Sequence, residues 1–171
     1  MAQWRPHSVN MTLGSHSHIA ATGSNITSQV TIGNYTSIAP HVSMHTLFNH
    51  ACIANPQLVS TAQLAGYPSV MTKEKIVIGS DVWIGRNATL LGNITIGDGA
   101  IIGAFSVVAK DIPPYAVVVG NPAVIKRYRF TSEQIEALLT IKWWLWSSQK
   151  VEENKEEMKD IDIFLKKHVI Q

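Results

Sequence analysis

Large aliphatic residues recur at every sixth position in two stretches of the chain. They are, in the first stretch, Ile26, Ile32, Ile38 and Met44 and, in the second, Ile78, Ile84, Leu90, Ile96, Ile102 and Val108. A small residue stands four positions after most of them, as at Val82, Ala88 and Ala100. A period of six matches neither the 3.6 of an α-helix nor the 2 of a strand. It is typical of a chain that turns a corner every six residues, with about eighteen residues in each three-sided coil.

Such coils predict an all-β core, in which the aliphatic residues point inward and stack from coil to coil. Glycine follows several of them directly, as at Gly79 and Gly85, where a Cβ would obstruct the chain. Four nearby residues are of the types that tolerate a left-handed φ at a corner. They are Asp81, Asn87, Asn93 and Asp98.

The two stretches are not in phase with each other. The separation of Met44 and Ile78 along the chain is not a multiple of six, and no periodic residue stands between them. Leu13 and Ile19 extend the first stretch one residue out of phase. We therefore expect an inserted loop at about 45–75. A loop of that length in a compact domain usually has a function.

The pattern changes after Gly120-Asn121-Pro122. Thr131 and Gln134 form a plausible capping box, and apolar residues then follow at helical spacing. Residues 150–168 are charged and predicted to be helical. We expect a coil domain over 1–122, with its insertion at 45–75, and a C-terminal helical tail over 123–171 that packs on the open end of the coils. The tail tryptophans Trp143, Trp144 and Trp146 have two interpretations, as packing residues or as a wall for substrate.

Composition excludes several classes of protein. The formal charge is +2, and no lysine or arginine cluster with interleaved aromatic residues indicates a nucleic-acid partner. The single cysteine, Cys52, excludes an internal disulfide and favours a reducing compartment. The sequence shows neither an apolar leader segment nor a run long enough to span a membrane. These features together predict a cytoplasmic protein.

The run from Ile84 to Ile112 contains the segments Ile84–Ala88, Ile96–Ala100 and Ile102–Ser106, each the first five residues of a hexad. This run resembles the signature of a known family, the hexapeptide-repeat acyltransferases. The segments Asp81–Gly85, Val108–Tyr115 and Gly120–Ala123 look like the coenzyme A-binding end of these proteins. The tail segments Arg129–Phe130 and Ile141–Trp144 resemble a narrower branch, which holds xenobiotic acetyltransferases of the streptogramin and chloramphenicol types and polysaccharide O-acetyltransferases.

This resemblance implies a left-handed parallel β-helix that assembles as a homotrimer, with active sites between subunits. It implies acetyl-CoA as co-substrate and no metal. The positions that match the family's coenzyme contacts are Gly85, Arg86, Gly103, Ala104, Ala109 and Lys110, with Lys126 and Arg127 as partners for its phosphates. Trp83 matches a residue that lies in the groove near the acetyl group.

Acetyl transfer to a hydroxyl needs a base that removes the hydroxyl proton, and histidine has a suitable pKa. In the branch that the tail resembles, the catalytic histidine follows an asparagine at the start of the irregular loop, so the resemblance implies His50 as the base, with Asn49 and Tyr67 beside the substrate. His45 is the second choice. The xenobiotic enzymes carry an aspartate shortly after this histidine, and 51–54 contains none. Cys52 is interpreted as an apolar residue rather than a nucleophile.

The acceptor stays open. We expect a small-molecule or glycan acceptor, first a sugar hydroxyl of a cell-surface polysaccharide or its precursor, then a hydroxylated antibiotic, then an amino sugar. Two other classes compete with acyl transfer. One is a gamma-type zinc carbonic anhydrase, in which His41, His45 and His50 would supply ligands. The other is a scaffold with the same coils and no catalysis.

Overall fold

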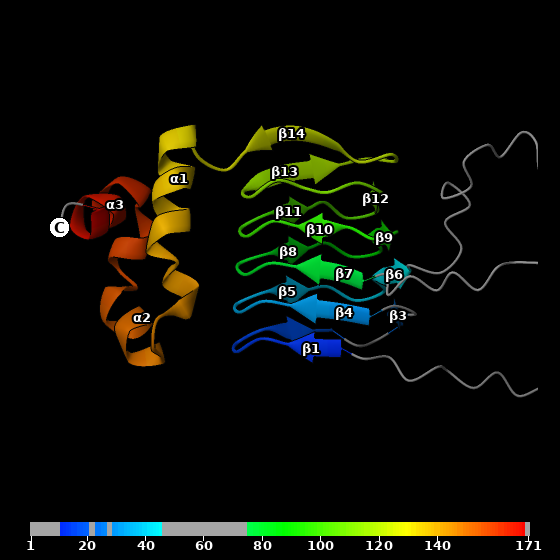
Figure 1. The fold of residues 1–171 in the computed structure, drawn as a ribbon, viewed down its shortest axis with the longest axis horizontal. Helices are drawn as coiled ribbons and strands as arrows, with labels where there is room; N and C mark the ends of the chain where they lie inside the picture. The colour runs from blue at the N-terminus through cyan, green and yellow to red at the C-terminus, as the bar shows by residue number, and fades with distance from the viewer. Residues whose placement is uncertain (1–10, 21–22, 27–28, 46–74, 170–171) are drawn as a thin grey trace, which may run out of the picture.

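The computed structural model describes residues 11–20, 23–26, 29–45 and 75–169, where the six-residue period forms a stack of three-sided coils (Figure 1). Sheet A holds β1 (Met11–Leu13), β4 (Gln29–Ile32), β7 (Lys75–Ile78) and β10 (Thr95–Ile96). Sheet B holds β2 (His18–Ile19), β5 (Ser37–Ile38), β8 (Trp83–Ile84), β11 (Ile101–Ile102), β13 (Ala116–Val119) and β14 (Val124–Tyr128). Sheet C holds β3 (Asn25–Ile26), β6 (Ser43–His45), β9 (Thr89–Leu91) and β12 (Val107–Val108).

The register between coils explains the period and its interruption. Ile84 pairs with Ile102 and Leu90 with Val108, so each partner stands three hexads along the chain, as predicted. Met44 of the first stretch pairs with Leu90 of the second, and the coil between them is therefore longer than three hexads. The additional chain lies between the end of β6 and the start of β7. The predicted insertion itself lies outside the described residues.

The first coil carries the phase shift that the sequence indicated. Leu13 pairs with Ile32, which is one position further than three hexads, whereas Ile26 pairs with Met44 at the regular spacing. The last coil is shorter than three hexads, because Ile102 pairs with Val118. Leu13, on the outermost described strand of sheet A, is 44% exposed.

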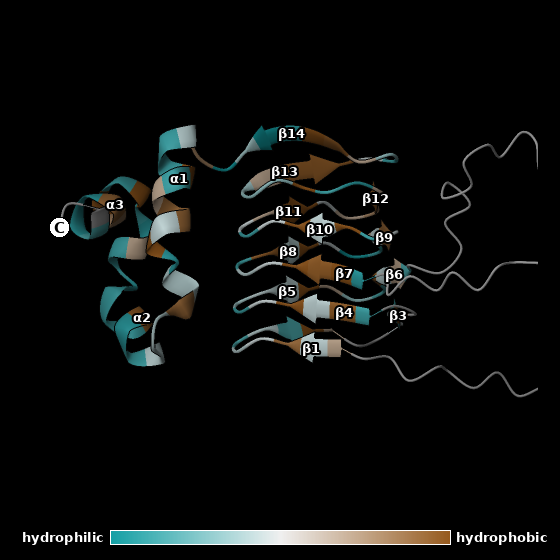
Figure 2. Cartoon of the chain, viewed as in Figure 1, coloured by the Kyte–Doolittle hydropathy of each residue, from teal (hydrophilic) through white to brown (hydrophobic). Residues whose placement is uncertain are grey.

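The core consists of columns of aliphatic side chains inside the coils. Ile38, Ile84 and Ile102 form one column and are fully buried. Each such burial contributes about 1.5–3 kcal/mol. The small residues four positions on, such as Ala88 and Ala100, are buried between them. In Figure 2 the inner strands β7, β11 and β13 are largely hydrophobic.

The corners use two different devices. Glycine is required for close approach, because a Cβ on Gly85 would lie 2.6 Å from the backbone nitrogen of Ala104 in the next coil. Left-handed φ angles occur two positions after Gly79 and Gly85, at 57° for both Asp81 and Asn87. The other two corner predictions were wrong: Asn93 and Asp98 have ordinary φ angles, and the neighbours Gly92 (89°) and Gly99 (70°) take the left-handed conformation.

The tail begins as a strand rather than a helix. β14 pairs antiparallel with β13, and its residues are exposed. The helices follow: α1 (Ser132–Ile141), α2 (Ser148–Asn154) and α3 (Ile161–Val169), with 3-10 turns at Trp143–Leu145 and Glu157–Lys159. The predicted capping box is present, because Gln134 donates its backbone N–H to the Thr131 hydroxyl while its side chain accepts from the Thr131 N–H. The division of the chain at residue 122 stays a prediction.

The helices cover one edge of the coil stack and not its open end. In Figure 1, α1 runs alongside the coils on the side opposite β6 and β9. Tyr115, at the turn from sheet A to sheet B, packs in one buried cluster with Leu138, Trp144 and Phe164. The prediction that the tail closes the open end was wrong, because the aromatic residues that contact it, Tyr35 and Tyr115, stand on turns well separated along the edge. No helix among the described residues is long and apolar enough to cross a membrane.

Candidate active site

The turns between sheets form three edges of the coil stack, and the predicted site residues lie on two of them. We call these edges the A–B corner (including 79–82 and 97–100), the B–C corner (including 85–88 and 103–106) and the C–A corner (including 91–94 and 109–111). Each corner repeats from coil to coil, about 4.8 Å apart. The tail covers the A–B corner.

Trp83 lies on the outer face of sheet B. Because Ile84 points into the core, Trp83 points outward, and its side chain is 50% exposed. Its partners in register are Ser37 on β5 and Ile101 on β11. The outward row continues through Val117, which pairs with Arg127 on β14. Trp83 and Arg127 therefore stand on one face of one sheet, two coils and one strand apart.

Four of the predicted coenzyme residues form the adjoining B–C corner. Gly85–Arg86 and Gly103–Ala104 occupy the same place in successive coils, since Ile84 pairs with Ile102. Arg86 and Ala104 are exposed, whereas Gly85 is buried against the next coil. Among the described residues, the backbone N–H groups of Arg86 and Ala104 have no hydrogen-bond acceptor. The corner thus holds two unpaired amide donors, one in each of two successive coils.

Comparison with the A–B corner shows that unpaired N–H groups at a corner result from the local sequence and not from the fold. There the equivalent N–H groups are bonded to side chains of the next coil: that of Asn34 donates to Ser80 Oγ (3.0 Å), and that of Ser80 to Asp98 Oδ1 (2.6 Å). At the B–C corner the residue that follows Arg86 by one coil is Ala104, which has no side-chain acceptor. The N–H group of Arg86 is therefore left available to a ligand.

The remaining predicted residues lie elsewhere. Ala109 and Lys110 are at the C–A corner, both exposed, and Lys126 lies on β14 beside a register shift. The insertion leaves sheet C at His45 and enters sheet A at Lys75, so its two ends also lie at the C–A corner. Asn49, His50 and Tyr67 are outside the described residues. Sheet C thus separates the two sets of predicted residues within one chain.

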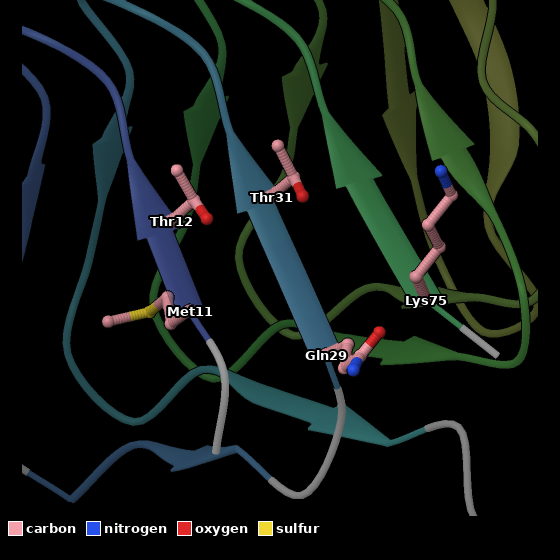
Figure 3. Close-up of a pocket in the computed structure, with 5 residues that line it drawn as sticks. All are labelled: Met11, Thr12, Gln29, Thr31 and Lys75. Atoms are coloured by element: carbon pink, nitrogen blue, oxygen red, sulfur yellow. The ribbon is translucent and has the colours of Figure 1, made fainter. Parts of the chain in front are cut away.

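The outer face of sheet A contains none of the predicted residues. A shallow depression of about 410 Å³ there is lined by Met11, Thr12, Gln29, Thr31 and Lys75. Figure 3 shows these side chains spread along β1, β4 and β7, with Thr12 and Thr31 side by side. They form no cluster of groups that could perform acid–base chemistry.

Comparison with known proteins agrees with this geometry. Residues 75–110 match the family model described as bacterial transferase hexapeptide (six repeats). The chain is 49% identical over 84 residues to a probable macrolide acetyltransferase of Lysinibacillus sphaericus, an alignment of 49% of this chain and 47% of that protein. It is 36% identical over 120 residues to the putative lipopolysaccharide biosynthesis O-acetyl transferase WbbJ of Escherichia coli K12, covering 70% of this chain and 58% of WbbJ.

A solved structure extends the likeness to the fold. A hexapeptide-repeat acetyltransferase of Vibrio cholerae, in complex with acetyl coenzyme A, superposes with a TM-score of 0.57 at 27% identity, over 71% of this chain and 62% of that one. The hexads of residues 75–110 are thus those of the bacterial hexapeptide transferases, and the relatives and solved structures that resemble the chain are acetyltransferases. The matched family model and these neighbours imply a left-handed coil. The chain spans about half the length of the two curated relatives.

The tail tryptophans of this chain pack against the coils. Trp144 is 4% exposed, and its carbonyl oxygen accepts a hydrogen bond from Asn34 Nδ2 (3.0 Å). The Trp143 ring lies 4.9 Å from that of Tyr35, which stacks on His16. All of these contacts are at the A–B corner. They support the packing interpretation over a substrate wall in the same chain.

Arg129 was named in the sequence only as part of the family resemblance, and its role at this edge was missed. Its Nη1 donates to Asp81 Oδ2 and to the Gly99 carbonyl oxygen, both at 2.8 Å. Burial raises the pKa of the Asp81 carboxyl, and the guanidinium opposes that rise. Burial and the Asp81 charge raise the pKa of the Tyr115 phenol, so its hydroxyl stays protonated. No periodic signal marked Arg129, since it stands in the connection between β14 and α1.

The zinc hypothesis gains no support from the part of the chain that the structure describes. No three histidine, cysteine, aspartate or glutamate side chains there lie close enough to share a metal ion. His41 is exposed at the B–C corner, whereas His45 ends β6 on sheet C. The third predicted ligand, His50, lies outside the described residues.

Proposed function

We propose that this protein transfers the acetyl group of acetyl-CoA directly to a hydroxyl of a sugar, in a cell-surface polysaccharide or its precursor. The observation that carries the proposal is the row of unpaired N–H groups at Arg86 and Ala104, in a family whose Vibrio cholerae member is solved with acetyl coenzyme A. The pantetheine arm of coenzyme A is extended and rich in amide carbonyls. Two donors at the spacing of successive coils suit such an arm.

The outer face of sheet B continues this path. Trp83 stands directly before the B–C corner and offers an exposed ring beside the reacting end of the arm. Arg127, in the same outward row, is an exposed cation for the coenzyme phosphates. Lys126 is its neighbour on β14. These residues contribute by binding and orienting the thioester. None of them forms a covalent intermediate in the proposed reaction.

A second copy of the chain completes the proposed site. Trp83 and the B–C corner lie across sheet C from the ends of the insertion, which we propose brings His50, Asn49 and Tyr67 to the acceptor. Ala109 and Lys110 share the edge of the insertion. In a homotrimer, the C–A corner of one subunit faces the B–C corner of its neighbour across a groove, so each site takes residues from two chains.

The chemistry at this site is general-base catalysis. The acceptor hydroxyl attacks the thioester carbonyl carbon while a neutral imidazole, proposed to be that of His50, takes the hydroxyl proton. The C–S bond breaks as the tetrahedral intermediate collapses, and the coenzyme thiolate leaves and takes up a proton. Removal of such a base lowers the rate about 10²–10⁴-fold.

The test compares two histidine variants. Thiol release from acetyl-CoA is measured against a panel of sugars and hydroxylated antibiotics, with His50→Ala and with His41→Asn as the control, since asparagine tolerates the left-handed φ of 62° at that position. We expect His50→Ala to lose at least about 10²-fold in kcat while it still binds acetyl-CoA, and His41→Asn to keep its activity. Equal loss in both variants would favour zinc ligation, and unchanged turnover in His50→Ala would refute the base.

Antibiotic acceptors are the second candidate, because the probable macrolide acetyltransferase shares 49% identity with the chain over 84 residues. The match to WbbJ has lower identity, but it covers 70% of the chain. The acceptor panel separates the two: a macrolide or other hydroxylated antibiotic acetylated faster than every sugar would replace the polysaccharide assignment.

A further inference from the structure

Phe105, at the B–C corner, has a backbone conformation that its side chain disfavours. Its φ is 60°, in the left-handed region, where a bulky side chain is rare and costs stability. The residue at the same place in the preceding coil is Asn87, a type that tolerates this conformation. The Phe105 N–H donates to the Arg86 carbonyl oxygen (2.9 Å), so the coil holds the turn in place. Such strain is a reason to look for a use of the side chain.

Two rings at the equivalent place of the A–B corner show what such a residue does. Tyr35 and Tyr115 also follow a buried isoleucine by three positions and have left-handed φ angles of 55° and 57°. The Tyr35 ring lies 4.9 Å from that of Trp143, and the Tyr115 ring lies 5.5 Å from that of Phe130. Phe105 makes no ring contact within the described chain and is 67% exposed. We therefore look for its partner outside the chain.

The path proposed for acetyl-CoA passes this ring. Trp83 stands at the reacting end of that path and Arg127 at the phosphate end, so the pantetheine arm runs from the Arg86 N–H toward the Ala104 N–H. In the arm, the amide carbonyl farther from the sulfur is followed by a hydroxyl-bearing carbon and then by a carbon with two methyl groups. With that carbonyl on the Ala104 N–H, the two methyl groups lie beside the next side chain, which is Phe105.

We propose that Phe105 binds the geminal dimethyl group of coenzyme A and thereby selects the acyl donor. This inference rests on the proposed function. The two methyl groups are the apolar part of an otherwise polar arm, and an exposed phenyl ring offers them a large apolar surface. Contact removes both surfaces from water. Backbone N–H groups alone would bind any chain that carries amide carbonyls, whereas the ring favours a donor with this branched carbon.

The test isolates the two methyl groups from the rest of the coenzyme. Calorimetric titrations of the full-length protein use acetyl-CoA and its analogue in which hydrogen atoms replace both methyl groups. We expect the wild type to bind acetyl-CoA about five- to tenfold more tightly than the analogue, as for the burial of two methyl groups. Phe105→Asn should bind both probes with the weaker affinity. Phe105→Tyr keeps the ring and should discriminate like the wild type.

Stability separates this role from a structural one. Asparagine suits a left-handed φ, so Phe105→Asn should raise the melting temperature by about 1–4 °C while it weakens acetyl-CoA. Leu145→Asn is the matched control, because Leu145 is an equally exposed apolar residue (66%) on the tail, and it should leave both affinities unchanged. Sedimentation should give the same assembly for Phe105→Asn as for the wild type.

Four results would overturn this inference and leave the proposed function standing. They are a wild type that binds both probes equally well, a Phe105→Asn variant that still discriminates between them, a melting temperature of that variant below the wild type, and dissociation of its assembly. The last result would assign the ring to a contact between copies of the chain. A wild type that binds neither probe would overturn the proposed function as well.

Discussion

Replacing Arg129 with methionine should loosen the tail from the coils. The side chain joins successive coils, because Nη1 bonds both Asp81 and the Gly99 carbonyl oxygen. Its backbone N–H donates to the Tyr115 carbonyl oxygen (2.9 Å), and its guanidinium lies 5.3 Å from the centroids of the Tyr115 and Phe130 rings. Methionine keeps most of the aliphatic contact and the backbone bond, so the variant removes the charge and its two hydrogen bonds.

The expected loss is about 2–3 kcal/mol of unfolding free energy. Breaking a fully buried ion pair costs about 3–5 kcal/mol, whereas an exposed pair is worth about 0–1 kcal/mol. The side chains of Arg129 and Asp81 are 25% and 23% exposed, so this pair belongs nearer the buried limit. Most of the loss comes from the Asp81 carboxylate, which would remain buried without a counter-charge.

Arg127→Met is the matched control. Arg127 lies two positions earlier on exposed β14, and its only side-chain hydrogen bond within the described chain is to the carbonyl oxygen of Tyr128 (3.2 Å). Urea unfolding is followed by tryptophan fluorescence, which reports mainly on the tail, and by far-ultraviolet circular dichroism, which reports on the coils as well. We expect the Arg129 variant to lose stability and its tail amides to exchange faster with solvent, while the control stays within about 0.5 kcal/mol of the wild type.

The pH dependence of the stability loss in Arg129→Met tests whether the Asp81 carboxylate causes it. Burial holds the pKa of Asp81 above its ordinary value even with Arg129 present, so the native state binds this proton more tightly than the unfolded chain does. The penalty of the charged form is therefore complete at neutral pH and disappears as the pH falls through the folded pKa. Without Arg129 the penalty is larger, so the stability difference between variant and wild type should shrink from pH 7 toward pH 4.

Two results would refute this account. One is a stability difference that stays constant across that pH range. The other is an Asp81→Asn/Arg129→Met double variant no more stable at pH 7 than Arg129→Met alone, because removal of the stranded charge should restore part of the loss. If Arg127→Met lost as much unfolding free energy as Arg129→Met, the loss would not depend on the contacts of Arg129 with Asp81 and Gly99.

Three further changes test the coils and the tail. Ile84→Ala should cost about 2–5 kcal/mol in urea unfolding, since it opens a cavity in a fully buried column, while Leu145→Ala, at a 66% exposed side chain, should cost little. Gly85→Ala places a Cβ 2.6 Å from the backbone nitrogen of Ala104 and should cost about 1–3 kcal/mol, with lower affinity for acetyl-CoA; wild-type stability would contradict the close approach. Thr131→Ala removes the helix cap and should cost about 1 kcal/mol, seen as a lower urea midpoint.

The coils could be predicted because every hexad repeats the same requirement. An aliphatic residue must fill the inside of each face, and the column of Ile38, Ile84 and Ile102 shows that it does. The capping box of α1 was predictable for the same reason, since Thr131 and Gln134 satisfy a local need. The corners were predicted less well: Asp98 was expected to turn left-handed, but Gly99 is its neighbour and adopts that conformation at no steric cost.

The docking of the tail could not be predicted from local pattern. Helical spacing shows that α1 has an apolar face, but it does not show which part of the coils covers that face. The answer depends on aromatic residues at turns far apart in the chain, Tyr35 and Tyr115, each of which has a left-handed φ (55° and 57°) that carries its ring outward. β14 was missed because a hairpin back along sheet B follows directly after Pro122, where the sequence pattern showed only that the hexads end.

Two of the corners explain how a uniform repeat produces a single kind of site. The A–B and B–C corners follow the same backbone path, with a left-handed residue three positions after the buried aliphatic residue, but the side chain that stands one coil further on decides whether the N–H group of each turn is hydrogen-bonded. At the A–B corner, Ser80 and Asp98 accept those bonds, and the tail packs over the edge. At the B–C corner, Ala104 cannot accept, so the amide N–H of Arg86 has no acceptor in the described chain. A chain with an acceptor at position 104 would keep the coil and lose the donor at Arg86. Ala104→Asp should therefore weaken acetyl-CoA far more than it weakens the fold.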